Sequence, residues 1–159
     1  MKIKLLYAFI LSITVLFASC NFENAYFINF LKQYQDAKIC YYVSYSPNTI
    51  PTNFTFIANG SGGIISCDLD KFKTTSITNF DYDGLSITFN GDVNDFNNLV
   101  DNLKITIIKK ENVENIAIIY GLSNYFCMYT SINNIYINVE IAFNKGIITI
   151  GSPIILGSY

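Results

Sequence analysis

The chain of 159 residues contains no histidine, no arginine and no tryptophan. Without histidine, the carboxylates are the main candidates for general acid or base chemistry, and a cysteine nucleophile lacks its usual basic partner. Without arginine, and with no basic cluster larger than Lys109-Lys110, the chain lacks the clustered cations that bind nucleic-acid phosphates. These absences indicate a protein that is not an enzyme, binds no nucleic acid and uses no cofactor.

Charged residues are also scarce, at 14% of the chain, whereas 51% of the residues are hydrophobic and 16% are aromatic. This composition is typical of a folded domain and excludes an intrinsically disordered chain. Removal of a segment that contains Lys2 and Lys4 would leave eight lysines against twelve acidic residues, a net charge of 8 − 12 = −4.

The N-terminus has the pattern of an export signal. Lys2 and Lys4 precede an apolar run at 5–18, and small residues follow at the end of this run. The run is too short to cross a bilayer, which takes about 20 residues. We therefore predict a signal peptide at 1–19 and one compact domain at 20–159.

The last residues of the predicted signal peptide indicate whether the mature chain is attached to a membrane. The sequence Phe17-Ala18-Ser19-Cys20 resembles the lipobox of bacterial lipoproteins, with Phe in place of the usual Leu. The resemblance implies that Cys20 becomes the first mature residue and carries acyl chains, which would anchor the protein to a membrane. Ordinary secretion is the alternative. In either case the protein is extracytoplasmic, as a lipid-anchored surface or envelope protein or as a secreted one.

Periodicity predicts an α+β fold that is rich in strands. Helical spacing of apolar residues occurs at 21–37, and again after Asp92, which with Asp95 forms a capping-box pattern. Strands are expected at 38–46, 53–58, 64–68, 75–80, 85–89, 104–109, 116–120, 125–130, 134–143 and 147–150. The halves 21–90 and 91–159 therefore read as two pseudo-repeats, each an amphipathic helix followed by an antiparallel β-meander.

The four cysteines are disulfide candidates in an oxidising compartment. Alignment of the two repeats places Cys67 and Cys127 on equivalent strands, and a Cys67–Cys127 disulfide is the most economical pairing. Cys40 would be a free thiol if Cys20 carries lipid, or would pair with Cys20 if it does not. No metal site is expected, because the cysteines lie tens of residues apart.

Three acidic pairs, Asp68 with Asp70, Asp81 with Asp83, and Glu111 with Glu114, are interpreted as turn or surface residues rather than catalysts. Asn53 and Asn59 begin Asn-x-Ser/Thr sequons and would be glycosylated if the source is eukaryotic.

Abundant tyrosines favour a binding function, because a tyrosine joins a rigid apolar ring to a polar tip. The candidates for a binding face are Tyr41, Tyr42, Tyr45, Tyr120, Tyr125, Phe126 and Tyr129. We predict an exported, non-catalytic interaction module for an extracellular protein, with contact to the membrane only through the lipid anchor. A secreted carrier of a small hydrophobic ligand is the alternative, and an apolar cavity would favour it.

Overall fold

A computed structural model of the protein describes residues 29–34, 36–50, 52–72 and 82–156. The predicted signal peptide, Cys20 and the strand predicted at 75–80 lie outside these residues. The first predicted helix is described only from residue 29, where 29–31 form a helical turn. Within the described residues the chain is strand-rich and antiparallel, as predicted, with one longer helix, α2 (Val93–Asn102), and a short 3₁₀ helix, η1 (Leu69–Lys71).

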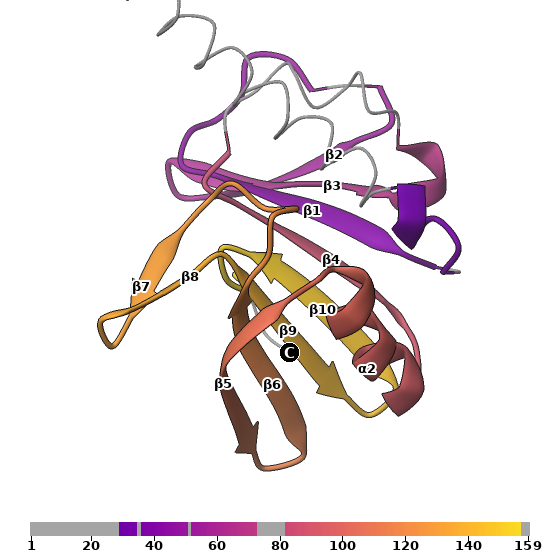
Figure 1. The fold of residues 1–159 in the computed structure, drawn as a ribbon. Coiled ribbons are helices and arrows are strands. Elements are labelled where there is room, and N and C mark those ends of the chain that lie inside the picture. The colour runs from indigo at the N-terminus through magenta and orange to yellow at the C-terminus, as the bar shows by residue number, and fades with distance from the viewer. Residues whose placement is uncertain (1–28, 35, 51, 73–81, 157–159) are drawn as a thin grey trace, which may run out of the picture.

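In the described part of the chain, ten strands form two sheets. The strands are β1 (Lys38–Val43), β2 (Thr55–Asn59), β3 (Gly62–Asp68), β4 (Gly84–Asn90), β5 (Thr106–Val113), β6 (Ile116–Leu122), β7 (Thr130–Ile132), β8 (Ile135–Ile137), β9 (Val139–Asn144) and β10 (Ile147–Ser152). Eight of them pair in the order β2-β3-β1-β4-β10-β9-β6-β5, and β7 and β8 form a separate pair. Figure 1 shows β7 and β8 projecting from the side of the larger sheet.

Strict alternation of side chains builds the core. In β1, Ile39, Tyr41 and Val43 face inward, and Lys38 and Cys40 lie on the opposite face. The central strands β4 and β10 add further inward-facing apolar residues, so that one continuous cluster joins both halves of the sequence. This cluster lies between the inner face of the sheet and α2.

The start of α2 is the one predicted at Asp92. The Asp92 carboxylate accepts hydrogen bonds from the backbone amides of Asn94 and Asp95, and the Asp95 carboxylate accepts one from the amide of Asp92. These bonds satisfy amides that have no partner inside the helix. Phe96 and Leu99 are buried and belong to the main apolar cluster.

The structure does not confirm the pseudo-repeat. In the second half, β5, β6, β9 and β10 are antiparallel neighbours in the large sheet, but β7 and β8 lie between β6 and β9 in the sequence and pair separately. In the first half, β1 pairs with β3 and β4, and β2 lies at the edge of the sheet. Segments that the alignment made equivalent therefore have different neighbours.

The last described residues fold back over the outer face of the sheet. A Cβ atom added at Gly151 would lie 2.3 Å from the backbone nitrogen of Ile155, so the close approach of this segment requires glycine there. Ile155 packs against Ile118 and Ala142 in a second, smaller apolar cluster on that face. The outer faces of β6 and β9 are thereby partly covered.

Candidate functional site

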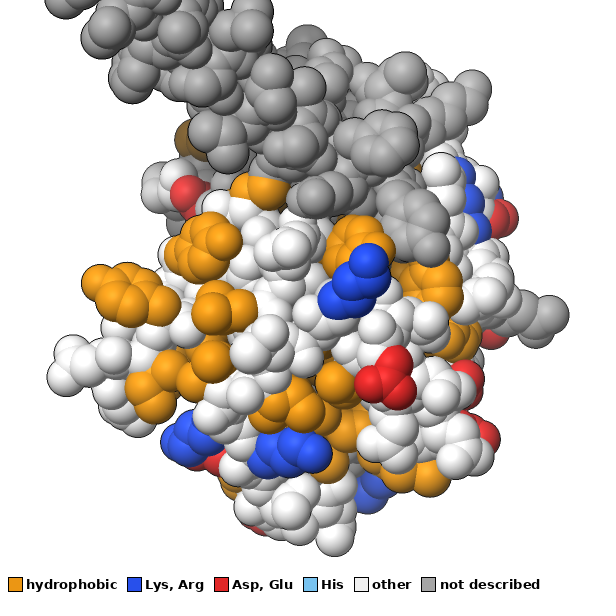
Figure 2. Space-filling model, viewed as in Figure 1, with side chains coloured by type: hydrophobic (Ala, Val, Ile, Leu, Met, Phe, Trp, Pro, Cys, Tyr) orange, Lys and Arg blue, Asp and Glu red, His pale blue; other side chains and the backbone are white. Residues whose placement is uncertain are grey.

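The β7–β8 hairpin is the most exposed aromatic feature among the described residues. Tyr129 directly precedes β7 and is 62% exposed, and Tyr136 in β8 is 71% exposed. Figure 2 shows orange side chains standing out at the left of the molecule, where Figure 1 places this hairpin. Isolated exposed apolar residues are ordinary, but several on one projecting element indicate a contact surface.

The register of the hairpin separates two faces. Ser131 lies opposite Tyr136, and Ile132 lies opposite Ile135. Because side chains alternate along a strand, Ser131 and Tyr136 share one face, and Tyr129 lies two positions before Ser131. We call Tyr129, Ser131 and Tyr136 the outward face of the hairpin. Ile132, Ile135 and Ile137 lie on the other face and line a cavity against the large sheet.

The turn of the hairpin is formed by two asparagines. Asn133 and Asn134 both have positive φ, at 51° and 64°. Two consecutive positive φ angles suit the tight turns that match the twist of a β-hairpin, and asparagine tolerates them well. The sequence therefore contained a signal for this hairpin, Asn-Asn between two short alternating runs, that the prediction of one strand at 134–143 missed.

A buried asparagine fixes the base of the hairpin. Asn138 separates β8 from β9 and is 1% exposed. Its side-chain oxygen accepts from the Ser123 amide at 2.8 Å, and its Nδ2 donates to the carbonyls of Ser123 and Phe126 at 2.7 and 2.8 Å. The Ser123 hydroxyl in turn donates to the Leu103 carbonyl at 2.6 Å. Satisfied buried networks of this kind hold a single geometry.

An acid-tyrosine cluster lies beneath the hairpin. Tyr120 is the cross-strand neighbour of both Lys109 and Glu140, and its phenol lies near the carboxylates of Glu140 and Glu111, either of which can accept its single O–H. Burial, followed by the charges of these two carboxylates, raises the pKa of Tyr120 to about 12. Lys109 forms an ion pair with Glu111, and this pairing lowers the pKa of Glu111.

The acid-tyrosine cluster joins strands of the large sheet to the segment that follows β10. Glu140 is 3% exposed and accepts a hydrogen bond from the Ile155 amide at 2.8 Å. The cavity beside Tyr120 has a volume of about 20 Å³, which is room for little more than one water molecule. Because Glu140 and Tyr120 are engaged with each other and with the folded-back segment, the arrangement serves to join β5, β6, β9 and residues 153–156.

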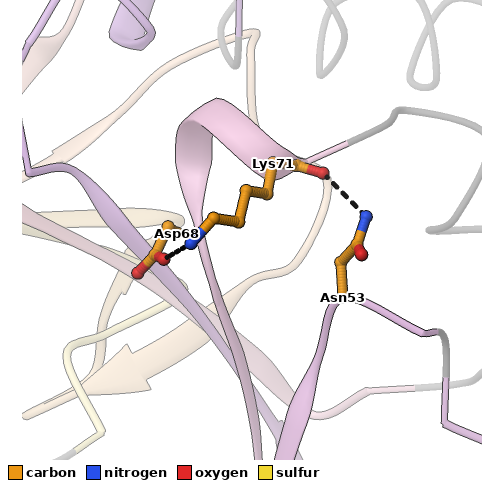
Figure 3. Close-up of polar contacts among 3 residues, drawn as sticks. All are labelled: Asn53, Asp68 and Lys71. Atoms are coloured by element: carbon orange, nitrogen blue, oxygen red, sulfur yellow. Dashed lines mark hydrogen bonds and ion pairs between the residues drawn. The ribbon is translucent and has the colours of Figure 1, made fainter.

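Of the three acidic pairs considered from sequence, Glu111 belongs to this cluster and its companion Glu114 is exposed, and the other two pairs lie elsewhere. Asp68 and Asp70 are exposed at η1, where Lys71 pairs with Asp68 at 2.5 Å and lowers its pKa (Figure 3). Asp83 is exposed before β4, and Asp81 lies outside the described residues. Within the part of the chain that the structure describes, no group of three metal-ligating side chains comes together.

The predicted Cys67–Cys127 disulfide is wrong for this structure. Cys67 is a buried free thiol on the inner face of β3, and Cys40 is a half-buried free thiol on the outer face of β1. Cys127 is in a disulfide, and its partner is neither Cys40 nor Cys67. The prediction failed because Cys67 lies in a strand, whereas Cys127 lies in an irregular segment before β7, so the two are not equivalent.

The two sequon asparagines are accessible. Asn59 is exposed at the end of β2, and Asn53 is exposed and donates a 3.5 Å hydrogen bond to the Lys71 carbonyl (Figure 3). Their glycosylation stays a prediction that depends on the source.

The tyrosines do not gather on one sheet face as the sequence suggested. Tyr41 and Phe126 are core residues, and Tyr42, Tyr120 and Tyr125 are half-buried. Of that group only Tyr45, at 38%, and Tyr129 are well exposed. Tyr136, which was not among the candidates, is the most exposed aromatic residue described.

Two open depressions also mark the surface, each with a volume of about 540 Å³. One is lined largely by charged residues around Lys32 and Asp70, and the other by Tyr42, Ile64, Leu156 and neighbouring polar residues. Neither is an enclosed apolar chamber. No helix in the described ranges is long and apolar enough to span a bilayer.

Comparisons with protein-family models, with characterised proteins and with solved structures found no match to this chain.

Proposed function

We propose that this chain is an exported, non-catalytic binding module that contacts an extracellular partner through the outward face of the β7–β8 hairpin. The observation that carries the proposal is the exposure of Tyr129 and Tyr136 on a hairpin whose base is fixed by buried hydrogen bonds. A preformed surface loses little conformational freedom on binding, and exposed tyrosines supply contact area with few rotatable bonds.

A non-catalytic role is favoured by the arrangement of the acid-tyrosine cluster. Glu140 is buried against Tyr120 and the Ile155 amide, beside a cavity of about 20 Å³. A substrate could not reach it without displacement of the folded-back segment. A general acid or base must approach the proton that it transfers, so this geometry supports a structural role.

The carrier of a small hydrophobic ligand is the second candidate, and it has less support. Pockets that bury such ligands have volumes of about 300–1,000 Å³ and enclose most of the ligand surface. The depression beside Tyr42 has the volume but is open to solvent. The residues of the main cluster instead pack against one another.

Binding is tested by retention of extracellular material from the native host on immobilised mature protein. The hairpin variant carries Tyr129→Ser and Tyr136→Ser, and the matched control carries Tyr45→Ser, which alters an exposed tyrosine far from the hairpin in sequence. We expect retention by the wild type and the control and its loss in the hairpin variant. Equal retention by all three proteins would contradict the proposed surface.

Two forms of the mature chain are proposed as alternatives. The lipobox-like sequence supports a lipid anchor at Cys20, whereas the disulfide at Cys127, with Cys40 and Cys67 free, supports ordinary secretion. A thioether-linked Cys20 has no thiol for a disulfide, so anchoring and a bridge at Cys20 exclude each other. The test is the intact mass of the mature protein before and after reduction. A chain beginning at Cys20 with added acyl mass supports the anchor, and an unmodified Cys20 in a disulfide with Cys127 contradicts it and supports ordinary secretion.

A further inference from the structure

The chemistry of the hairpin narrows the class of partner. The stretch from Met128 to Asn138, which contains β7, β8 and their turn, has no charged side chain. Its exposed groups are aromatic rings, hydroxyls and amides, together with the side chain of Ile135, which is 38% exposed on the other face of the hairpin. On an otherwise acidic protein this is a neutral surface that can donate and accept hydrogen bonds.

The charged residues near the hairpin do not make its outward face charged. The closest charged residue across the cavity is Lys109, which lies on the inner side of the hairpin and is paired with Glu111. The outward face therefore offers no cation for a phosphate, sulfate or acidic peptide. Salt bridges, which give many protein interfaces their register, are also missing here.

We infer that the outward face of the hairpin binds a neutral glycan. Tyr129 and Tyr136 provide two exposed rings on which the C–H faces of sugar rings can pack, with Ser131 between them along the face. The phenol and serine hydroxyls, with the amide of Asn134 in the exposed turn, can form hydrogen bonds to sugar hydroxyls. Stacking rings with uncharged hydrogen-bonding groups are the complement of an uncharged, hydroxyl-rich chain.

The projecting position of the hairpin also suits the binding of a long polymer. It projects from the side of the large sheet (Figure 1), so an extended chain can cross its outward face without entering a pocket. The hydrogen bonds of Asn138 fix the base of the hairpin, so the backbone that carries the two rings is already ordered before the ligand binds. This inference rests on the proposed binding function and specifies its partner.

The inference is tested by affinity electrophoresis of the mature protein in gels that contain a mixed-linkage β-glucan, an α-mannan or a galactomannan, with polygalacturonate as the acidic comparison. We expect retardation in at least one neutral gel, and no weakening by added salt, because no charge pairs contribute. The Tyr129→Ala, Tyr136→Ala double variant should bind at least about tenfold more weakly, as expected when central aromatic contacts are removed.

Two further proteins and one stability measurement make the result interpretable. Tyr45→Ala should bind like the wild type, and Tyr129→Phe with Tyr136→Phe should keep much of the binding, because the rings remain. Equal urea midpoints would show that the double alanine variant is folded. No retardation in any neutral gel, or retardation that survives in the double variant, would overturn the inference. Retention of a host protein without glycan binding would overturn it while leaving the proposed binding function standing.

Discussion

The side chain of Asn138 is bonded on both sides to the segment that precedes the β7–β8 hairpin, with its oxygen 2.8 Å from the Ser123 amide nitrogen. Its Nδ2 reaches the carbonyls of Ser123 and Phe126. At this position the side-chain hydrogen bonds of Asn138 take the place of the backbone hydrogen bonds that a continuous strand would form. The orientation of the hairpin depends on it.

Replacement of Asn138 by alanine should therefore destabilise the fold. The Ser123 amide and two carbonyls would lose their partners in a buried place, and each unsatisfied group costs about 1–3 kcal/mol. We expect a clear fall in the free energy of unfolding, measured by urea denaturation. Asn112→Ala, at an exposed position in β5, is the control and should change little. A change in the Asn138 variant no larger than in the control would contradict this account.

Asn138 also shows where prediction from sequence stops. The run at 134–143 alternates as one strand would, but the structure breaks it into β8 and β9 at Asn138. Alternation records only which face a residue occupies, and it cannot show that a side chain will bond to a carbonyl that is distant in sequence. The projecting hairpin, and with it the candidate site, follows from that long-range contact.

Features that depend only on residues close together in the sequence, such as helix caps and tight turns, were predicted correctly. The Asp92 capping box begins α2 as predicted, and Lys145-Gly146 forms the β9–β10 turn with positive φ at both residues. The place of β1 between β3 and β4 was not predictable in this way, since it depends on pairings between distant segments.

Stability at high pH should depend on Tyr120. The folded state holds its pKa at about 12, against 10.0 for an unperturbed tyrosine. The unfolded chain therefore deprotonates first, so this contribution is complete below pH 10 and is lost as the pH rises toward 12. Tyr120→Phe should show a shallower loss of urea midpoint over this range than the wild type. Parallel curves for the two proteins would refute the assignment.

Stability in acid should depend on Asp92. Hydrogen bonds from the backbone amides of Asp95 and Asn94 lower its pKa below the ordinary value of 3.8. The resulting stabilisation is present above that value and is lost as the pH falls through the lowered pKa. Asp92→Asn keeps a capping oxygen but does not titrate, so its urea midpoint should fall less steeply below about pH 4. An unchanged slope would count against the role of this carboxylate.

The Cys67 thiol should be unreactive in the native protein. Burial, with the nearby Asp68 carboxylate as the next cause, raises its pKa to about 12, and the thiolate is the reactive form. Iodoacetamide should alkylate Cys67 slowly in the folded chain and rapidly in urea without reductant. Alkylation that requires a reductant would show that Cys67 is in a disulfide and would restore the pairing predicted from sequence.

The most direct test of the binding account is site-specific photo-crosslinking in the native extracellular setting. A benzophenone amino acid replaces Tyr136 in one protein and Tyr45 in another, and crosslinked material is measured for both. If the outward face of the hairpin is the contact surface, we expect strong crosslinking from position 136 and little from position 45. Crosslinking from position 45 alone, or from neither position, would contradict it.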